Sequence, residues 1–167
     1  MSYELKRLAD KNLGTAITLA KHYRDLNQPE EAESICRDVL AVAPDNADAL
    51  RTLGLALTDR FSSAWMSLFE EACSTFKKLP TDYERAYYVA VAWERYAKAQ
   101  LEAGRAHNAI HAFEEAMQRF EEASQHAAKD DPAPILHYNH CVRALTTNPE
   151  LMRASLEPHL PKYELGD

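Results

Sequence analysis

The sequence predicts an all-α protein, and three observations support this prediction. Strong helix formers such as Ala, Leu, Glu, Arg and Lys are plentiful, β-branched residues are sparse, and only 4 of 167 residues are glycine. Apolar residues recur at spacings of three and four, which is the period of one helix face. The pattern of 16–44 then recurs 34 residues later. We therefore expect one domain of antiparallel helix–turn–helix units with a sizeable core.

The first unit, 16–44, contains two predicted helices. A helix over 13–26 has one apolar face, formed by Ala16, Leu19, Ala20 and Tyr23. Pro29 suits the start of the next helix, because its missing N–H would have no partner there. That helix extends to residue 43 and has a second apolar face, formed by Ala32, Ile35, Cys36 and Val39. Residues 2–11 are expected to form a short helix or an extension.

The second unit repeats the first and then departs from it. A helix over 47–59 places its apolar face 34 residues after the first one, at Leu50, Leu53, Gly54 and Leu57. Gly54 and Ala20 occupy the same place, where we expect the paired helix to cross closely. The following helix, 62–79, is longer and has an apolar stripe, formed by Trp65, Phe69, Ala72 and Phe76. This stripe is expected to be core, with a surface for a partner helix as the alternative.

The later units are longer than the first. Thr81 or Asp82 is expected to cap a helix over 83–103, and Gly104 ends it. The next helix, to residue 128, has its core at Ala109, Phe113 and Ala116. A turn at 129–132 precedes the first helix of a fourth unit. The core of this helix is expected at Ile135, Tyr138, Asn139 and Val142. A final helix over 149–157 closes the chain. The steps of 43 and 42 residues between small positions, which are Gly54, Ala97 and Asn139, indicate elongated middle helices.

These features resemble the tetratricopeptide-repeat family, whose period is about 34 residues. The small residues Ala20, Gly54 and Ala97, the closing Pro44 and the break at Gly104 carry the resemblance. It covers 13–146, with 1–12 as an N-terminal extension and 147–167 as a capping helix and tail. It implies three repeats and a degenerate fourth, stacked as a short right-handed solenoid with elongated middle helices. An antiparallel bundle without superhelical twist is the alternative.

In that family the first helix of each repeat lines a concave groove, and the resemblance implies which residues face it. The basic and histidine positions are Lys21, Arg24, Arg51, Arg95, Lys98, His140 and Arg143, with His137 beside them. Two acids, Asp48 and Glu94, also occupy groove-facing positions, whereas other acids are concentrated in the second helix of each unit. A basic groove in an acidic chain favours an acidic partner segment. The alternative is a solvated face with i,i+4 pairs such as Glu94–Lys98.

Net charge and apolar runs narrow the classes of partner, and the cysteines indicate the compartment. The formal net charge of −7 disfavours nucleic acid, whose binding depends on neutralising phosphates. No run approaches the roughly 18 apolar residues of a membrane span, and the N-terminus has no apolar leader. The three cysteines form no CxxC pair, so each is expected to be a small buried hydrophobe in a reducing cytoplasm.

No catalytic residue, metal or cofactor is expected. His107 and His111 form one cluster, and His137, His140 and Cys141 form another. Neither supplies a clear set of three or four zinc ligands. A Cys141–His137 pair lacks an evident orienting group and oxyanion donors.

The expected function is therefore a non-enzymatic module or scaffold that binds an acidic or extended segment of another protein. A small secretion-type chaperone and a homo-oligomeric adaptor are alternatives of the same kind. A helical metal-binding domain using the histidine clusters is the alternative of a different class.

Overall fold

The computed structural model describes residues 3–157, apart from the side chains of 63–66. Within this part of the chain all regular structure is helical, as expected. A short 3-10 turn precedes eight α-helices, which are η1 (Asp10–Asn12), α1 (Leu13–Asp25), α2 (Pro29–Val42), α3 (Ala47–Thr58), α4 (Phe61–Phe76), α5 (Asp82–Glu102), α6 (Ala106–His126), α7 (Ala133–Thr147) and α8 (Pro149–Leu156). None of the described helices is long and apolar enough to cross a membrane.

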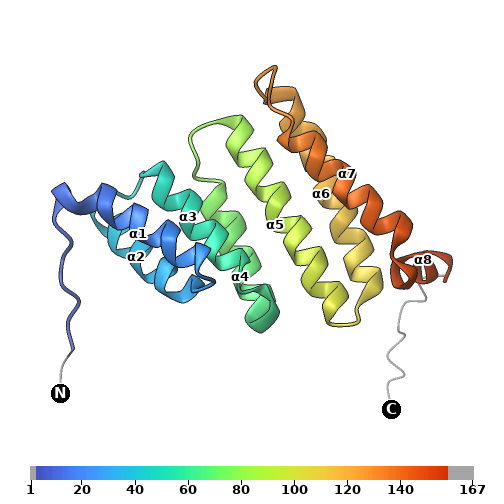
Figure 1. Cartoon of the computed structure of the whole chain (residues 1–167), viewed down its shortest axis with the longest axis horizontal. Coiled ribbons are helices and arrows are strands. Elements are labelled where there is room, and N and C mark those ends of the chain that lie inside the picture. Colours follow the sequence, from blue (N-terminus) through green and yellow to red (C-terminus); the bar gives the residue numbers. More distant parts are fainter. Residues whose placement is uncertain (1–2, 158–167) are drawn as a thin grey trace, which may run out of the picture.

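The helices follow one another across the molecule in chain order (Figure 1), and each packs against the next. Helix α1 also contacts α3, and α3 contacts α5. The odd-numbered helices therefore form one layer, against which α2, α4 and α6 pack as a second layer. Helices α5 and α6 have 21 residues each and form the most extensive pair. Helix α8 closes the far end against α6 and α7.

Local sequence explains where several helices begin and end. The side chains of Asn46, Thr81 and Asn148 accept hydrogen bonds from backbone N–H groups in the first turns of α3, α5 and α8. These bonds satisfy donors that have no partner within the helix. Of the two expected caps of α5, Thr81 and Asp82, the structure selects Thr81. Asn27 (φ 58°) and Gly104 (φ 71°) adopt the left-handed conformation in the turns after α1 and α5.

Two large buried clusters form most of the core. The first joins α1 to α5, and the second joins α5 to α8. Trp93 and Tyr96 of α5 pack against both clusters, so α5 connects the two halves of the core. Phe76 is fully buried and Phe69 is half-buried, which makes the aromatic stripe of α4 part of the core at these positions. The side chain of Trp65 lies outside the described residues.

Of the two expectations for 2–11, a short helix or an extension, the described residues 3–9 form the extension, and only the turn Asp10–Asn12 is helical. One expected element bound is wrong. Helix α4 ends at Phe76 instead of near residue 79, although Leu79 beyond it is still buried against the core. The chain turns at 77–81 because Pro80 cannot donate a helical hydrogen bond.

The face that α7 buries differs by one residue from the expected face. The buried and half-buried positions that contact the core are Pro134, His137, Tyr138 and Cys141. Ile135, expected in the core, is 57% exposed. One residue rotates a helix face by about 100°, so a different stripe meets α6. The physical reason is a buried carboxylate on α5 that draws two histidines of α7 towards it, as described below.

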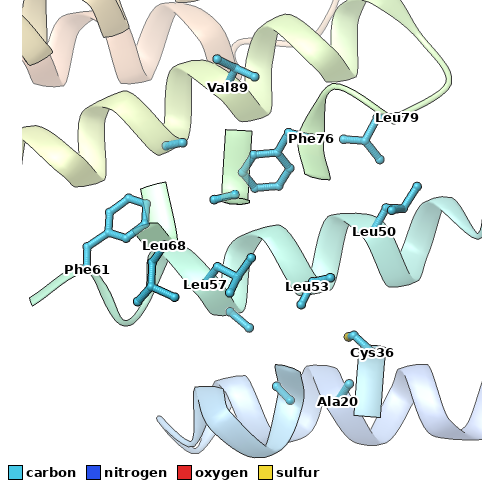
Figure 2. Packing of buried hydrophobic residues seen from close by; sticks show 14 residues of the cluster. Ala20, Cys36, Leu50, Leu53, Leu57, Phe61, Leu68, Phe76, Leu79 and Val89 are labelled. Atoms are coloured by element: carbon cyan, nitrogen blue, oxygen red, sulfur yellow. The ribbon is translucent and has the colours of Figure 1, made fainter. Parts of the chain in front are cut away.

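Gly54 lies where α3 and α4 approach most closely. A methyl carbon added at Gly54 would lie only 2.2 Å from Cε1 of Phe76. Figure 2 shows the Phe76 ring between α3 and α5, with Leu53 and Leu57 on α3 below it. The ring also stacks on Tyr88 of α5 at 5.3 Å. The expected close crossing at the small position is therefore confirmed for Gly54.

Replacing Gly54 by Ala is expected to lower the free energy of unfolding by about 1–3 kcal/mol, because the added carbon overlaps a ring that cannot move away. Urea unfolding measures this change. Gly14→Ala in α1 is the matched control, since nothing lies within 4 Å of the added carbon. It should stabilise the protein slightly through helix propensity.

A second substitution tests the contact itself. Phe76→Leu alone should destabilise the protein by leaving a cavity. Combined with Gly54→Ala, it removes Cε1 and Cζ, the two ring atoms nearest the added carbon, so the loss in the double variant should be smaller than the two single losses added together. Additive losses would contradict the proposed cause.

Candidate functional site

Ion pairs connect the expected groove positions from helix to helix along the odd-numbered layer. We call this set the charged row, and its members are Lys21, Arg24, Asp48, Arg51, Asp59, Glu84, Glu94, Arg95, Lys98, His137, His140 and Arg143. All members except Arg143 make an ion pair or a histidine–carboxylate contact within the described part of the chain. Their arrangement determines what this face can bind.

The first link joins α1 to α3 at two points. Lys21 Nζ lies 3.4 Å from Asp48 Oδ1, and both side chains are about half exposed. Arg24 Nε donates to Asp59 Oδ2 at 2.8 Å. Only 19% of the Arg24 side chain and 21% of the Asp59 side chain are exposed, so solvent screens this second pair less than the first.

The second link joins α3 to α5. Arg51 donates to Asp48 at 2.7 Å and to Glu84 at 2.5 Å. Burial by itself raises the pKa of Glu84, but the hydrogen bonds from Arg51 and Thr81 and the charge of Arg51 together outweigh it and lower the pKa. Asp59 also accepts a hydrogen bond from Arg95 of α5. Asp59 therefore bridges α1 and α5 from the end of α3.

The third link joins α5 to α7 through Glu94, whose side chain is only 3% exposed. Its Oε1 lies 2.6 Å from His140 Nδ1 and 3.0 Å from Lys98 Nζ, and its Oε2 lies 2.7 Å from His137 Nδ1. The His137 ring stacks on Phe120 of α6 with centroids 5.0 Å apart. One buried carboxylate thus connects two histidines and a lysine.

The surroundings of Glu94 keep it ionised. Burial by itself raises the pKa of this carboxyl, but the hydrogen bond from His137 and the charge of Lys98 outweigh that effect and lower the pKa to about 2. A buried carboxylate needs such partners, because an unpaired buried charge is costly.

The structure brings the expected groove residues together and adds two acids that sequence reasoning missed. Asp59 and Glu84 join the row, so it holds four carboxylates instead of two beside its six Lys and Arg side chains. The missed acids lie outside the places that the repeat pattern assigns to the groove. A search for opposite charges about one repeat apart would have found them, since Arg24–Asp59 and Arg51–Glu84 are 35 and 33 residues apart.

Two adjoining depressions lie along the row and share Lys98. One, of about 370 Å³, lies between the end of α3, the start of α4 and α5, and its charged lining residues are Arg95 and Lys98 together with the acids Asp59 and Glu102. The other, of about 290 Å³, lies between α5 and α7, and Glu94, Leu136, His137 and His140 line it. Lys98 is exposed and forms part of both walls, so one ligand can reach both depressions.

Other candidate chemistry from the sequence finds little geometric support. Within 3–157, no three His, Cys, Asp or Glu side chains are placed to hold a metal ion. Burial raises the pKa of Cys141 to about 12 and that of Cys36 to about 12. Cys73, which is half-buried instead of fully buried, has a pKa raised to about 11 by the same cause. These thiols are therefore protonated at neutral pH and poor nucleophiles.

No family model matches the chain, and no curated protein is similar enough to it to be matched. The function must therefore be argued from the site itself.

Glu94→Gln should lower the free energy of unfolding at neutral pH by about 2–3 kcal/mol, because it removes an ionised, fully partnered carboxylate. The pKa of Glu94 falls on folding from 4.5 to about 2. Its ionised form therefore contributes stability above pH 4.5, and this contribution is lost as the pH falls towards 2.

Urea unfolding at several pH values tests this expectation. The difference between wild type and Glu94→Gln should shrink as the pH falls below 4.5. Glu102→Gln, an exposed acid of α5, is the control and should change the stability by less than about 0.5 kcal/mol. Equal losses in the two variants would contradict the special role of Glu94.

Proposed function

We propose that the chain is a non-enzymatic protein-binding module of the tetratricopeptide-repeat type. It holds an acidic or extended segment of another protein against the charged row. The observation that carries the proposal is the pair of adjoining depressions that share Lys98 and are lined by Arg95, His137 and His140. Grooves of this kind bind extended peptides through side-chain pockets and charge complementarity.

The distribution of charge supports an acidic partner. The row holds six Lys and Arg side chains and four carboxylates, whereas the whole chain has a formal net charge of −7. Lys21, Lys98 and Arg143 are exposed and accessible to a ligand. Arg51 and Arg95 are held by ion pairs, so their guanidinium groups already have fixed orientations. An acidic segment would therefore be attracted to this face more than to the rest of the surface.

The spacing of the ion pairs supports the repeat architecture. Arg24–Asp59, Arg51–Glu84 and Asp59–Arg95 join residues 35, 33 and 36 positions apart, each close to one repeat. In a helical solenoid, equivalent positions of successive repeats lie side by side. We therefore propose a short right-handed solenoid. Its three free cysteines suit a reducing compartment such as the cytoplasm.

A variant that removes the exposed cations of the row tests the proposal. Lys21→Gln, Lys98→Gln and Arg143→Gln are combined, and Arg24, Arg51 and Arg95 are left intact to preserve the less exposed ion pairs between helices. The ligand is a fluorescein-labelled peptide in which glutamate and leucine alternate. Fluorescence anisotropy should show binding about tenfold weaker than that of the wild type, with a smaller salt dependence.

The matched control neutralises three exposed lysines outside the row, Lys77, Lys78 and Lys129, by the same change to Gln. It should bind the peptide as the wild type does. A second peptide with lysine in place of glutamate should bind neither protein. Equal weakening in the two triple variants would mean that only net charge matters and would refute the groove.

A further inference from the structure

The two histidines of the charged row face one carboxylate with the same ring nitrogen. Nδ1 of His137 and Nδ1 of His140 lie 2.7 and 2.6 Å from the two oxygens of Glu94. In a neutral imidazole, an Nδ1–H that donates to a carboxylate leaves Nε2 as the atom that accepts a proton. Within the described part of the chain, neither Nε2 atom has a hydrogen-bond partner. Both rings are partly exposed, at 36% and 49%, in the depression between α5 and α7.

The groups that surround these histidines come from three helices, α5, α6 and α7. From α5 they are Glu94, Lys98 and the phenol of Tyr87, whose ring meets His137 edge-on at 5.7 Å. Helix α6 contributes the uncharged ring of Phe120. On α7 itself, Cys141 is a protonated thiol and Arg143 is exposed.

The charge of this cluster changes when the histidines take up protons. With neutral histidines, the charges of Glu94 and Lys98 cancel. Glu94 stays ionised throughout the range in which histidine titrates, because its pKa is about 2. Each proton taken up at Nε2 therefore adds a positive charge that no further acid of the cluster compensates. Arg143 lies one turn of α7 beyond His140 and adds a further positive charge.

We infer that the depression between α5 and α7 is a proton-linked binding site for a carboxylate of the partner. Protonation of His137 and His140 converts a locally neutral pocket into a doubly cationic one. The inference rests on the proposed function of the charged row and adds its regulation by pH. Binding is tighter below the pH range of histidine titration and weaker above it. By linkage, a bound carboxylate also favours protonation of the two rings.

The same depression indicates what lies next to that carboxylate. Leu136 forms part of its wall and is 60% exposed, so it offers an apolar contact to a ligand there. Lys98 connects the depression to the neighbouring one, which Arg95 lines. The best-fitting segment therefore has an apolar residue beside the acid that meets the histidines.

The test compares peptide binding at pH 6 and pH 8, the range in which histidine changes its charge. The probe is the labelled peptide of alternating glutamate and leucine. Wild-type protein should bind it about tenfold more tightly at pH 6, as expected for added charges at short range in a partly solvated site. In His137→Gln/His140→Gln the ratio should fall below about twofold, because Gln keeps a donor for Glu94 but gains no charge.

Controls separate this inference from the proposed function and from misfolding. His111→Gln/His126→Gln removes two exposed histidines of α6 that lie outside the depression, and it should keep the full pH dependence. His140→Gln alone leaves the packed His137 ring in place. In this variant the logarithm of the ratio of affinities at pH 6 and pH 8 should be about half of the wild-type value. Circular dichroism verifies that each variant is folded.

The possible outcomes are distinct. Binding that needs the exposed cations of the row but does not change with pH in the wild type overturns this inference and leaves the proposed function standing. The same conclusion follows if His137→Gln/His140→Gln keeps the wild-type pH dependence. Wild-type protein that binds the peptide at neither pH overturns both.

Discussion

The contact between Phe76 and Gly54 is the constraint on which most of the structure depends. The ring lies against α3 at a position without a side chain and stacks on Tyr88 of α5. This contact sets how closely α3, α4 and α5 approach one another. At that separation Arg51 and Glu84 lie 2.5 Å apart and Asp59 reaches Arg95. The charged row is thus a consequence of the apolar packing beneath it.

The charged row has both a structural and a binding role in the arrangement proposed here. Exposed ion pairs contribute little stability, but Arg24–Asp59 is largely shielded from solvent and helps to fix the neighbouring helices. The pairs also orient guanidinium groups that retain further N–H donors for a ligand. An acidic segment can therefore bind beside these pairs without breaking them, and loss of helix-to-helix contacts does not have to accompany binding.

Glu94 determines how the last part of the row is built. A carboxylate with only 3% of its side chain exposed requires partners, and the nearest donors on α7 are His137 and His140. When both histidines contact Glu94, α7 is rotated so that Cys141 lies in the core and Ile135 and Leu136 are exposed. The same hydrogen bonds that fix the rotation of α7 therefore also create the depression and expose its apolar wall.

Local patterns in the sequence were enough to predict the helical class, most helix bounds, the cap at Thr81 and the close approach at Gly54, because each depends on neighbouring residues or on one period. The cations of the candidate site came from the groove positions that the repeat resemblance implies. The pairing of those cations with Asp59 and Glu84, the rotation of α7 and the two depressions were decided by tertiary structure alone. The physical reason is that a helix period defines an apolar face only approximately, whereas a buried charge such as Glu94 must find its partners wherever the fold brings them.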